Sequence, residues 1–114
     1  MPHFILDCSP EILAAQDRKH LLQSVWDVAQ ASGLFNPADI KTRLRVFDDY
    51  ITGGGDDPFI HVFAYIMEGR TVEQKSALSQ SVVGKLKSMF PDVPVISMNV
   101  MDFEKATYAN RNPV

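Results

Sequence analysis

Hydrophobic and polar residues follow two different periods along this chain. Four short stretches are alternating or continuously apolar, which predicts β-strands at residues 2–8, 40–51, 59–67 and 95–103. Two other stretches have apolar residues at helical spacing, with Leu21, Leu22, Val25, Trp26 and Ala29 in the first and Leu78, Val82, Leu86 and Met89 in the second. The predicted order is strand, helix, strand, followed by strand, helix, strand.

Capping residues mark the ends of the predicted helices. Ser9, which precedes a proline and a glutamate, is predicted to cap the first helix, and the polar residues 16–19 break or restart it. Gly33 is the predicted C-cap of that helix. The second helix is predicted to begin with a capping box in residues 71–74 and to stop before Pro91.

The alternation also assigns side chains to the two faces of each strand. In the first strand it separates two sets, Phe4, Leu6 and Cys8 on one face and His3, Ile5 and Asp7 on the other. In the second strand, three cations project from one face: Lys41, Arg43 and Arg45. The third strand is apolar on both faces, which is typical of a strand that is buried on both sides.

These elements predict a single domain over residues 1–114, built from similar units at residues 1–52 and 58–103, with a polar tail at 104–114. Helical crossovers make the paired strands of each unit parallel. We therefore expect an α/β (α+β) fold in which two fused β-α-β units form a four-stranded sheet with both helices on one face. Because the third strand is apolar on the uncovered face too, we expect the sheet to pack against other subunits.

Composition excludes several classes of function. The net charge is −3 and no basic tract is present, so we expect no nucleic-acid partner. No apolar run approaches membrane-spanning length, and the N-terminus does not have the pattern of a signal peptide. The single cysteine, Cys8, cannot form an internal disulfide, and no Cys/His spacing indicates a metal site. The default compartment is a reducing cytoplasm.

Pro2 is the leading candidate for a catalytic group. If Met1 is removed, the Pro2 nitrogen becomes a secondary amine at the head of a strand. An α-amino group has a pKa of about 7.7–8.0, which burial and nearby cations lower further toward the working range of a base. Lys41, Arg43 and Arg70 are the candidate cations, and arginine suits carboxylates because its planar fork binds them through two hydrogen bonds.

Simpler interpretations of these residues stay open. Pro2 could be an ordinary residue after an initiator, and the cations of the second strand could form a solvated face. His3 and His61 are more simply core or interface histidines than catalysts, and Cys8 is most simply buried and inert.

Several motifs resemble the tautomerase superfamily. Residues 68–75, Glu-Gly-Arg-Thr-Val-Glu-Gln-Lys, resemble the Glu-Gly-Arg-Ser-x-Glu-Gln-Lys segment of 4-oxalocrotonate tautomerase. The opening residues 1–9, Met-Pro-His-Phe-Ile-Leu-Asp-Cys-Ser, are similar to the 5-carboxymethyl-2-hydroxymuconate isomerase family, as are residues 33–35 and 40–43. That family has two fused β-α-β units in about this length.

The resemblance implies a tautomerase fold, a homotrimer and no cofactor. It implies a cytoplasmic isomerase that moves a proton along the dienol of an unsaturated dicarboxylate in the homoprotocatechuate branch of aromatic degradation. Pro2 would be the base and Arg70 would bind a carboxylate. Lys41 occupies a position where the family carries arginine, and Arg43 matches a neighbouring arginine. In the second unit the corresponding position holds only Asn99, so we expect no second full site there.

Two alternatives are kept. One is a non-catalytic trimeric binding protein that retains the tautomerase fold, because a shared fold does not confer a shared function. The other is a promiscuous keto–enol tautomerase that acts on arylpyruvates, which the lysine at position 41 leaves open.

Overall fold

A computed structural model describes residues 1–111. It contains a four-stranded sheet with the order β2-β1-β3-β4. The strands are β1 (His3–Cys8), β2 (Lys41–Val46), β3 (Phe59–Met67) and β4 (Val95–Phe103). The pairs β1/β2 and β3/β4 are parallel, as right-handed helical crossovers require, and the central pair β1/β3 is antiparallel.

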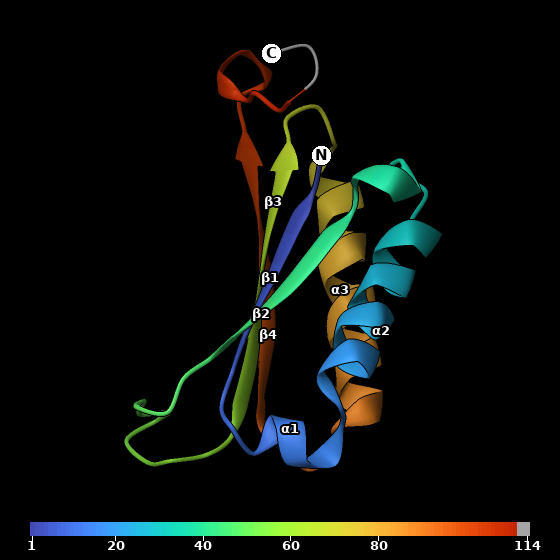
Figure 1. The fold of residues 1–114 in the computed structure, drawn as a ribbon. Helices are drawn as coiled ribbons and strands as arrows, with labels where there is room; N and C mark the ends of the chain where they lie inside the picture. Colours follow the sequence, from blue (N-terminus) through green and yellow to red (C-terminus); the bar gives the residue numbers. More distant parts are fainter. Residues whose placement is uncertain (112–114) are drawn as a thin grey trace.

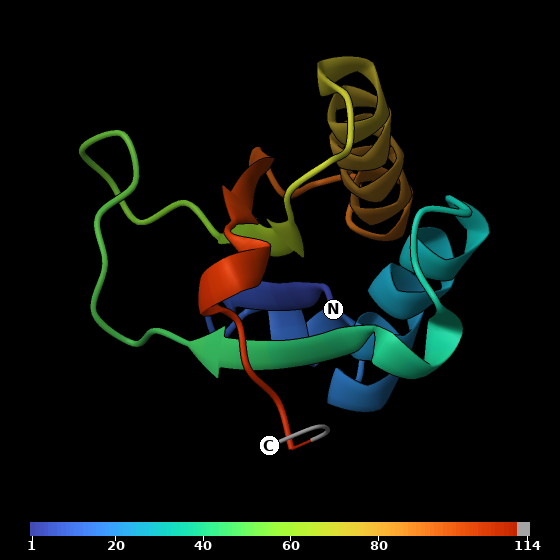
Figure 2. The same ribbon diagram turned by 90° about the horizontal axis from the view of Figure 1, so that it is seen from above.

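Two long helices cover one face of the sheet (Figures 1 and 2). The helical elements are α1 (Ile12–Ala15), α2 (Arg18–Ala31) and α3 (Val72–Met89), with short 3-10 turns η1 (Pro37–Asp39) and η2 (Lys105–Thr107). The predicted α+β architecture of two fused β-α-β units is thus confirmed. The assigned limits of the two repeats, 1–52 and 58–103, stay a prediction. Among the described residues, no helix is both long and apolar enough to cross a membrane.

The caps of the two long helices follow from local sequence. The α2 helix begins at Asp17, whose side chain accepts a hydrogen bond from His20 N, and α3 begins with the predicted capping box of Thr71 and Gln74. Gly33 lies directly after the end of α2 with φ +73, a conformation that glycine adopts without strain.

The predicted cap at Ser9 is wrong. Its side chain is buried and its hydroxyl accepts a hydrogen bond from Phe59 N, so it ties the end of β1 to the start of β3. The first short helix begins later, at Ile12, and its N-cap Glu11 makes no side-chain capping bond. A long-range hydrogen bond therefore takes the group that a local helix start would have used.

The predicted second strand is too long at its C-terminal end. It was expected over residues 40–51, but β2 ends at Val46. Within residues 1–111 its strand partner is β1 alone, and the register places Val46 opposite Cys8, the last residue of β1. The chain then leaves the sheet as a long loop that projects from the domain (Figure 1), with a tight turn in which Thr52 and Gly55 exchange backbone hydrogen bonds.

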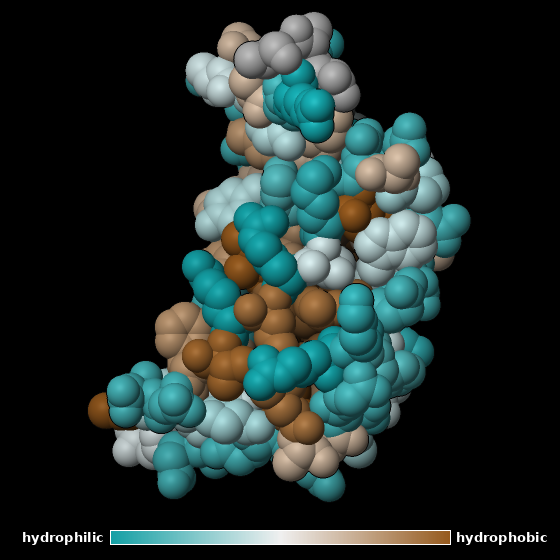
Figure 3. Space-filling view, in the orientation of Figure 1, coloured by the Kyte–Doolittle hydropathy of each residue, from teal (hydrophilic) through white to brown (hydrophobic). Residues whose placement is uncertain are grey.

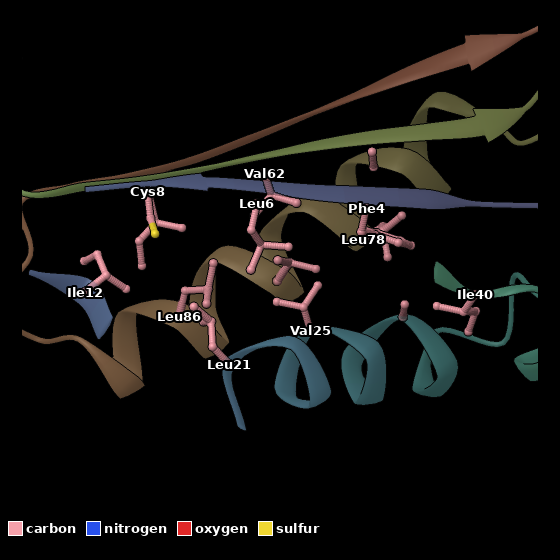
Figure 4. Close-up of a cluster of buried hydrophobic side chains, with 14 of the residues drawn as sticks. Phe4, Leu6, Cys8, Ile12, Leu21, Val25, Ile40, Val62, Leu78 and Leu86 are labelled. Atoms are coloured by element: carbon pink, nitrogen blue, oxygen red, sulfur yellow. The ribbon is translucent and has the colours of Figure 1, made fainter. Parts of the chain in front are cut away.

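The core lies between the sheet and the two long helices (Figure 4). The predicted inward faces of the strands and helices are buried in it, including the side chains of Phe4, Leu6, Cys8, Leu21, Val25, Ile60, Val62, Ile66, Leu78, Val82 and Leu86. Seen from one side, polar side chains surround apolar ones that gather between the sheet and the helices (Figure 3).

Neither of the two long helices covers the other face of the sheet, and we call it the open face. Alternation and register assign to it His3, Ile5, Asp7, Lys41, Arg43, Arg45, Phe59, His61, Phe63, Tyr65, Met67, Val95, Ser97, Asn99, Met101 and Phe103. The residues that β3 contributes are half-buried and alternate with fully buried ones. This confirms that β3 is apolar on both sides while the chain itself covers only one.

Candidate functional site

Pro2 occupies a fixed position at the head of β1. Its side chain is fully buried, and its carbonyl oxygen accepts a hydrogen bond of 3.2 Å from Lys41 N at the start of β2. This bond extends the parallel β1/β2 ladder by one residue beyond the strand proper. In the chain as described, the Pro2 nitrogen is the amide that follows Met1.

A hollow of about 370 Å³ opens beside the N-terminus. It is lined by Met1, Asp39, Lys41, Tyr108, Asn110 and Arg111. These residues come from the start of β1, the turn before β2 and the segment after η2, which lie at the same end of the sheet (Figure 1). Lys41 is held there because its Nζ donates a 2.7 Å hydrogen bond to the carbonyl oxygen of Asp39.

The electrostatic setting favours a neutral amine. Burial lowers the pKa of the terminal amine at Met1; the carboxylate of Asp39 opposes this shift, while the cations Lys41 and Arg70 add to it. Of the three predicted cations, Lys41 and Arg70 therefore act on the N-terminus electrostatically.

Arg70 is anchored between β3 and α3. Its Nη1 donates to the carbonyl oxygen of Met67 at 3.2 Å and its Nη2 to that of Leu34 at 2.5 Å. The guanidinium also lies over the ring of Phe35, 5.1 Å from its centroid. These contacts fix the position of the charge, which explains how a cation is kept just before the N-terminus of α3, where the helix dipole disfavours it.

Arg43 does not line the hollow but reaches it through two intermediaries. Its Nη1 lies 3.1 Å from His3 Nδ1, and His3 Nε2 lies 3.1 Å from the hydroxyl of Tyr108. The Tyr108 ring stacks on Phe103, with centroids 4.6 Å apart. Burial lowers the pKa of His3, and the neighbouring cations Arg43 and Lys41 lower it further.

Arg45, the third cation of β2, belongs to a different cluster. Its Nε and Nη2 donate to the two carboxylate oxygens of Asp7 at 2.7 and 3.1 Å. This two-bond pairing raises the pKa of Arg45 and directs its guanidinium to Asp7, on the neighbouring strand. Arg45 is therefore occupied by Asp7 and is not among the residues that line the hollow.

Four lining residues were not predicted from the sequence: Asp39, Tyr108, Asn110 and Arg111. Tyr108 is an aromatic residue in a polar tail, and this was the one sequence signal that could have pointed to it. For a metal the sequence predicted no site; in residues 1–111 no group of three His, Cys, Asp or Glu side chains is arranged to hold one.

Comparisons with known proteins identify the family of this chain. A family model described as 5-carboxymethyl-2-hydroxymuconate isomerase matches residues 2–114. The chain is 26% identical over 106 residues to 5-carboxymethyl-2-hydroxymuconate Delta-isomerase of Escherichia coli, covering 91% of this chain and 84% of that protein.

Solved structures share the fold. The protein Pt0534, solved after inactivation by 2-oxo-3-pentynoate, superposes with a TM-score of 0.83 at 23% identity, covering 96% of this chain and 91% of the other. A fused 4-OT symmetric trimer superposes with a TM-score of 0.81 at 21% identity, covering 98% of this chain and 94% of the other. With a family model that matches nearly its whole length, the chain belongs to the 5-carboxymethyl-2-hydroxymuconate isomerase family of tautomerase-like proteins.

Proposed function

We propose that this protein is a cofactor-free isomerase that shifts a proton on an unsaturated hydroxy dicarboxylate resembling 5-carboxymethyl-2-hydroxymuconate. The observation that carries the proposal is the placement of Pro2, buried at the head of β1 next to Met1, which lines the hollow and whose terminal amine has its pKa lowered by burial and by Lys41 and Arg70. The reaction would belong to aromatic degradation in the cytoplasm, in the homoprotocatechuate branch. It requires removal of Met1, because an amide nitrogen is not a base.

In the proposed mechanism the Pro2 nitrogen takes the proton from the dienol hydroxyl and returns it to a carbon of the same substrate. A base is most effective when its pKa lies near the working pH, and the local burial and charge move an amine in that direction. Arg70 and Lys41 bind carboxylate oxygens and stabilise the negative charge of the dienolate. Arg43 also contributes to the charge that attracts the dicarboxylate.

The active form is proposed to be a homotrimer. The open face contains a half-buried apolar strand surface from β3, which a single chain leaves uncovered. A structural neighbour with the same fold is a fused 4-OT symmetric trimer, which supports a trimer here. Packing the sheets of three chains together would also bring residues of a neighbouring subunit close to the hollow beside each N-terminus.

The test is a ketonisation assay with 5-carboxymethyl-2-hydroxymuconate on protein whose mass shows that Met1 is absent. We expect Pro2→Ala and Arg70→Ala each to lower kcat/KM by on the order of 10²-fold or more. Arg45→Gln is the matched control, because Arg45 is paired with Asp7 away from the hollow. Unchanged rates in both variants would reject the site proposed here, and retention of Met1 in protein from its native host would reject the role of Pro2. Absence of any ketonisation would leave the alternative of a non-catalytic trimeric binding protein.

A covalent probe gives a second readout. The neighbour Pt0534 was solved after inactivation by 2-oxo-3-pentynoate, an electrophile that an amine can attack. If Pro2 is a free secondary amine of lowered pKa, we expect this reagent to add its mass to the N-terminal peptide of our protein. An adduct on any other peptide would place the reactive nucleophile elsewhere.

One observation favours a second candidate, a keto–enol tautomerase of broader specificity acting on arylpyruvates. Lys41 supplies a point charge where the family resemblance implies an arginine. An arginine would bind a carboxylate through two hydrogen bonds, so Lys41 would hold this carboxylate less firmly. If the broader activity is native, Lys41→Arg should raise kcat/KM for the dicarboxylate relative to that for phenylpyruvate. Equal effects on the two substrates would argue against a role of Lys41 in the choice between them.

A further inference from the structure

A chain of three polar side chains leads from the open face into the hollow. It begins at Arg43, passes through the His3 ring and ends at the hydroxyl of Tyr108, with both contacts 3.1 Å long. Arg43 and His3 lie on adjacent strands, whereas Tyr108 follows η2, far along the sequence. Neither His3 nor Tyr108 has a part in the mechanism proposed above.

The order of donors and acceptors in this chain follows from chemistry. A guanidinium has only N–H donors, so His3 Nδ1 must accept the hydrogen bond from Arg43. An imidazole that accepts at Nδ1 is neutral and carries its proton on Nε2. His3 Nε2–H therefore donates to the oxygen of Tyr108. The lowered pKa of His3 is consistent with a neutral ring.

This order determines what the Tyr108 hydroxyl can do. Because the oxygen of Tyr108 accepts the hydrogen bond from His3 Nε2–H, its own O–H is directed away from the imidazole. Stacking on Phe103 fixes the plane of the ring, and Tyr108 is one of the residues that line the hollow beside the N-terminus. The fold thus presents a neutral O–H donor at the hollow where the other polar lining groups include Lys41 and Arg111.

We propose that Tyr108 donates a hydrogen bond to the oxygen of the substrate that becomes negative during the proton shift, and that Arg43 and His3 are positioning residues that set the direction of this bond. The inference rests on the proposed function and adds one catalytic residue to it. No bond is made or broken at Tyr108: the phenol keeps its proton, and the proton that moves is carried by the Pro2 nitrogen. The ligand chemistry it favours is an enolate or dienolate oxygen, whose charge is absent in the ground state.

The first experiment compares Tyr108→Phe with Tyr50→Phe. Tyr108→Phe keeps the ring and its stacking on Phe103 but removes the donor, so we expect kcat to fall by on the order of 10²-fold with little change in KM. Tyr50 donates to Glu11 in the remote loop region, and Tyr50→Phe should leave kcat unchanged. If Pro2→Ala lowers the rate and Tyr108→Phe does not, the inference fails while the proposed function stands.

A double-variant cycle tests whether His3 acts through Tyr108. We expect His3→Phe to lower kcat by a smaller factor than Tyr108→Phe, and the double variant to be no slower than Tyr108→Phe alone. Additive losses in the double variant would show that the two residues act separately and would overturn the positioning role.

A measurement without turnover tests the hydrogen-bond order itself. Nitrogen-15 NMR of the histidine rings near pH 7.5 should show His3 as the neutral tautomer protonated at Nε2. In Arg43→Met, which removes the donor to Nδ1, this preference should weaken. A His3 ring protonated at Nδ1 in the unaltered protein would overturn the inference whether or not the protein is an isomerase.

Discussion

The two faces of the sheet are built in different ways. The face under the helices is apolar and closed: Phe4, Leu6 and Cys8 of β1 have no exposed surface. The open face mixes apolar residues with charged and polar ones, and those that β1 and β3 contribute are only half-buried. The same strands therefore serve a core on one side and a surface on the other.

Polar side chains on the open face are paired with one another within the chain. Asp7 accepts two hydrogen bonds from Arg45, and the two ring nitrogens of His61 each lie 2.6 Å from a partner, Ser97 Oγ and Asn99 Oδ1. Paired groups lose less on leaving water than unpaired ones. In the proposed homotrimer the open face would thus be buried at a reduced cost, whereas the helix-facing side is already buried by its own chain.

The largest effect should come from Leu6→Ala on the closed face. Leu6 has no exposed surface, so its truncation leaves a cavity and should lower the free energy of unfolding by about 2–5 kcal/mol. Chemical denaturation should give the same loss at low and high protein concentration, because no subunit contact is removed.

Its neighbour Ile5 is the matched control, since it lies on the same strand but on the open face. Ile5→Ala should cost less in dilute protein and more at concentrations that favour assembly, since only assembly buries Ile5 fully. A loss at Ile5 that equals the loss at Leu6 and is independent of concentration would remove the distinction between the two faces.

The next effect should be on assembly rather than on folding. Phe63 lies in the row of β3 side chains on the open face, beside His61 and Tyr65. Phe63→Lys places a charge where the trimer would exclude water, so sedimentation should show smaller species while circular dichroism keeps the helical signal. The control is Val72→Lys, at a residue that is 72% exposed at the start of α3. This variant should leave the mass of the assembly in sedimentation unchanged. A trimer that survives Phe63→Lys would mean that another surface holds the subunits.

Periodicity was enough to predict most of this fold. The inward residues of β1 and the helix stripes follow from local alternation, which is a property of neighbouring residues and can be read without tertiary structure. The end of β2 was predicted too late, although the alternation breaks after Val46, where Phe47 is followed by Asp48 and Asp49. The break coincides with the end of the partner strand at Cys8, and a ladder needs both strands.

The candidate site was less predictable than the fold. Pro2, Lys41, Arg43 and Arg70 were predicted from a strand head, from strand cations and from resemblance, and their roles stay proposals. The contact between His3 and Tyr108 spans 105 positions and carries no periodic signal. The hydrogen-bond chain could thus be found only once the tail segment was placed beside the N-terminus.

The last test leaves the fold and the assembly unchanged and uses Cys8 to ask how firmly the closed face stays covered. Burial raises the pKa of its thiol from 9.0 to about 11. At pH 8 the raised pKa alone lowers the thiolate fraction, and with it the rate of alkylation by iodoacetamide, by on the order of 100-fold relative to the unfolded chain. Because the native thiolate forms at higher pH, the alkylation rate of the native protein should keep rising from pH 9 to 11. The alkylation rate of the unfolded chain should level off in that range.

The control is the same protein alkylated in urea, which gives the rate of the exposed thiol. Because α1, α2 and α3 of the same chain cover this face, the native rate should not depend on protein concentration. A native rate that falls as concentration rises would mean that assembly also protects Cys8, and so that the closed face opens when the open face is not covered. The two faces would then be coupled, and the stability of the core would depend on the partner subunits.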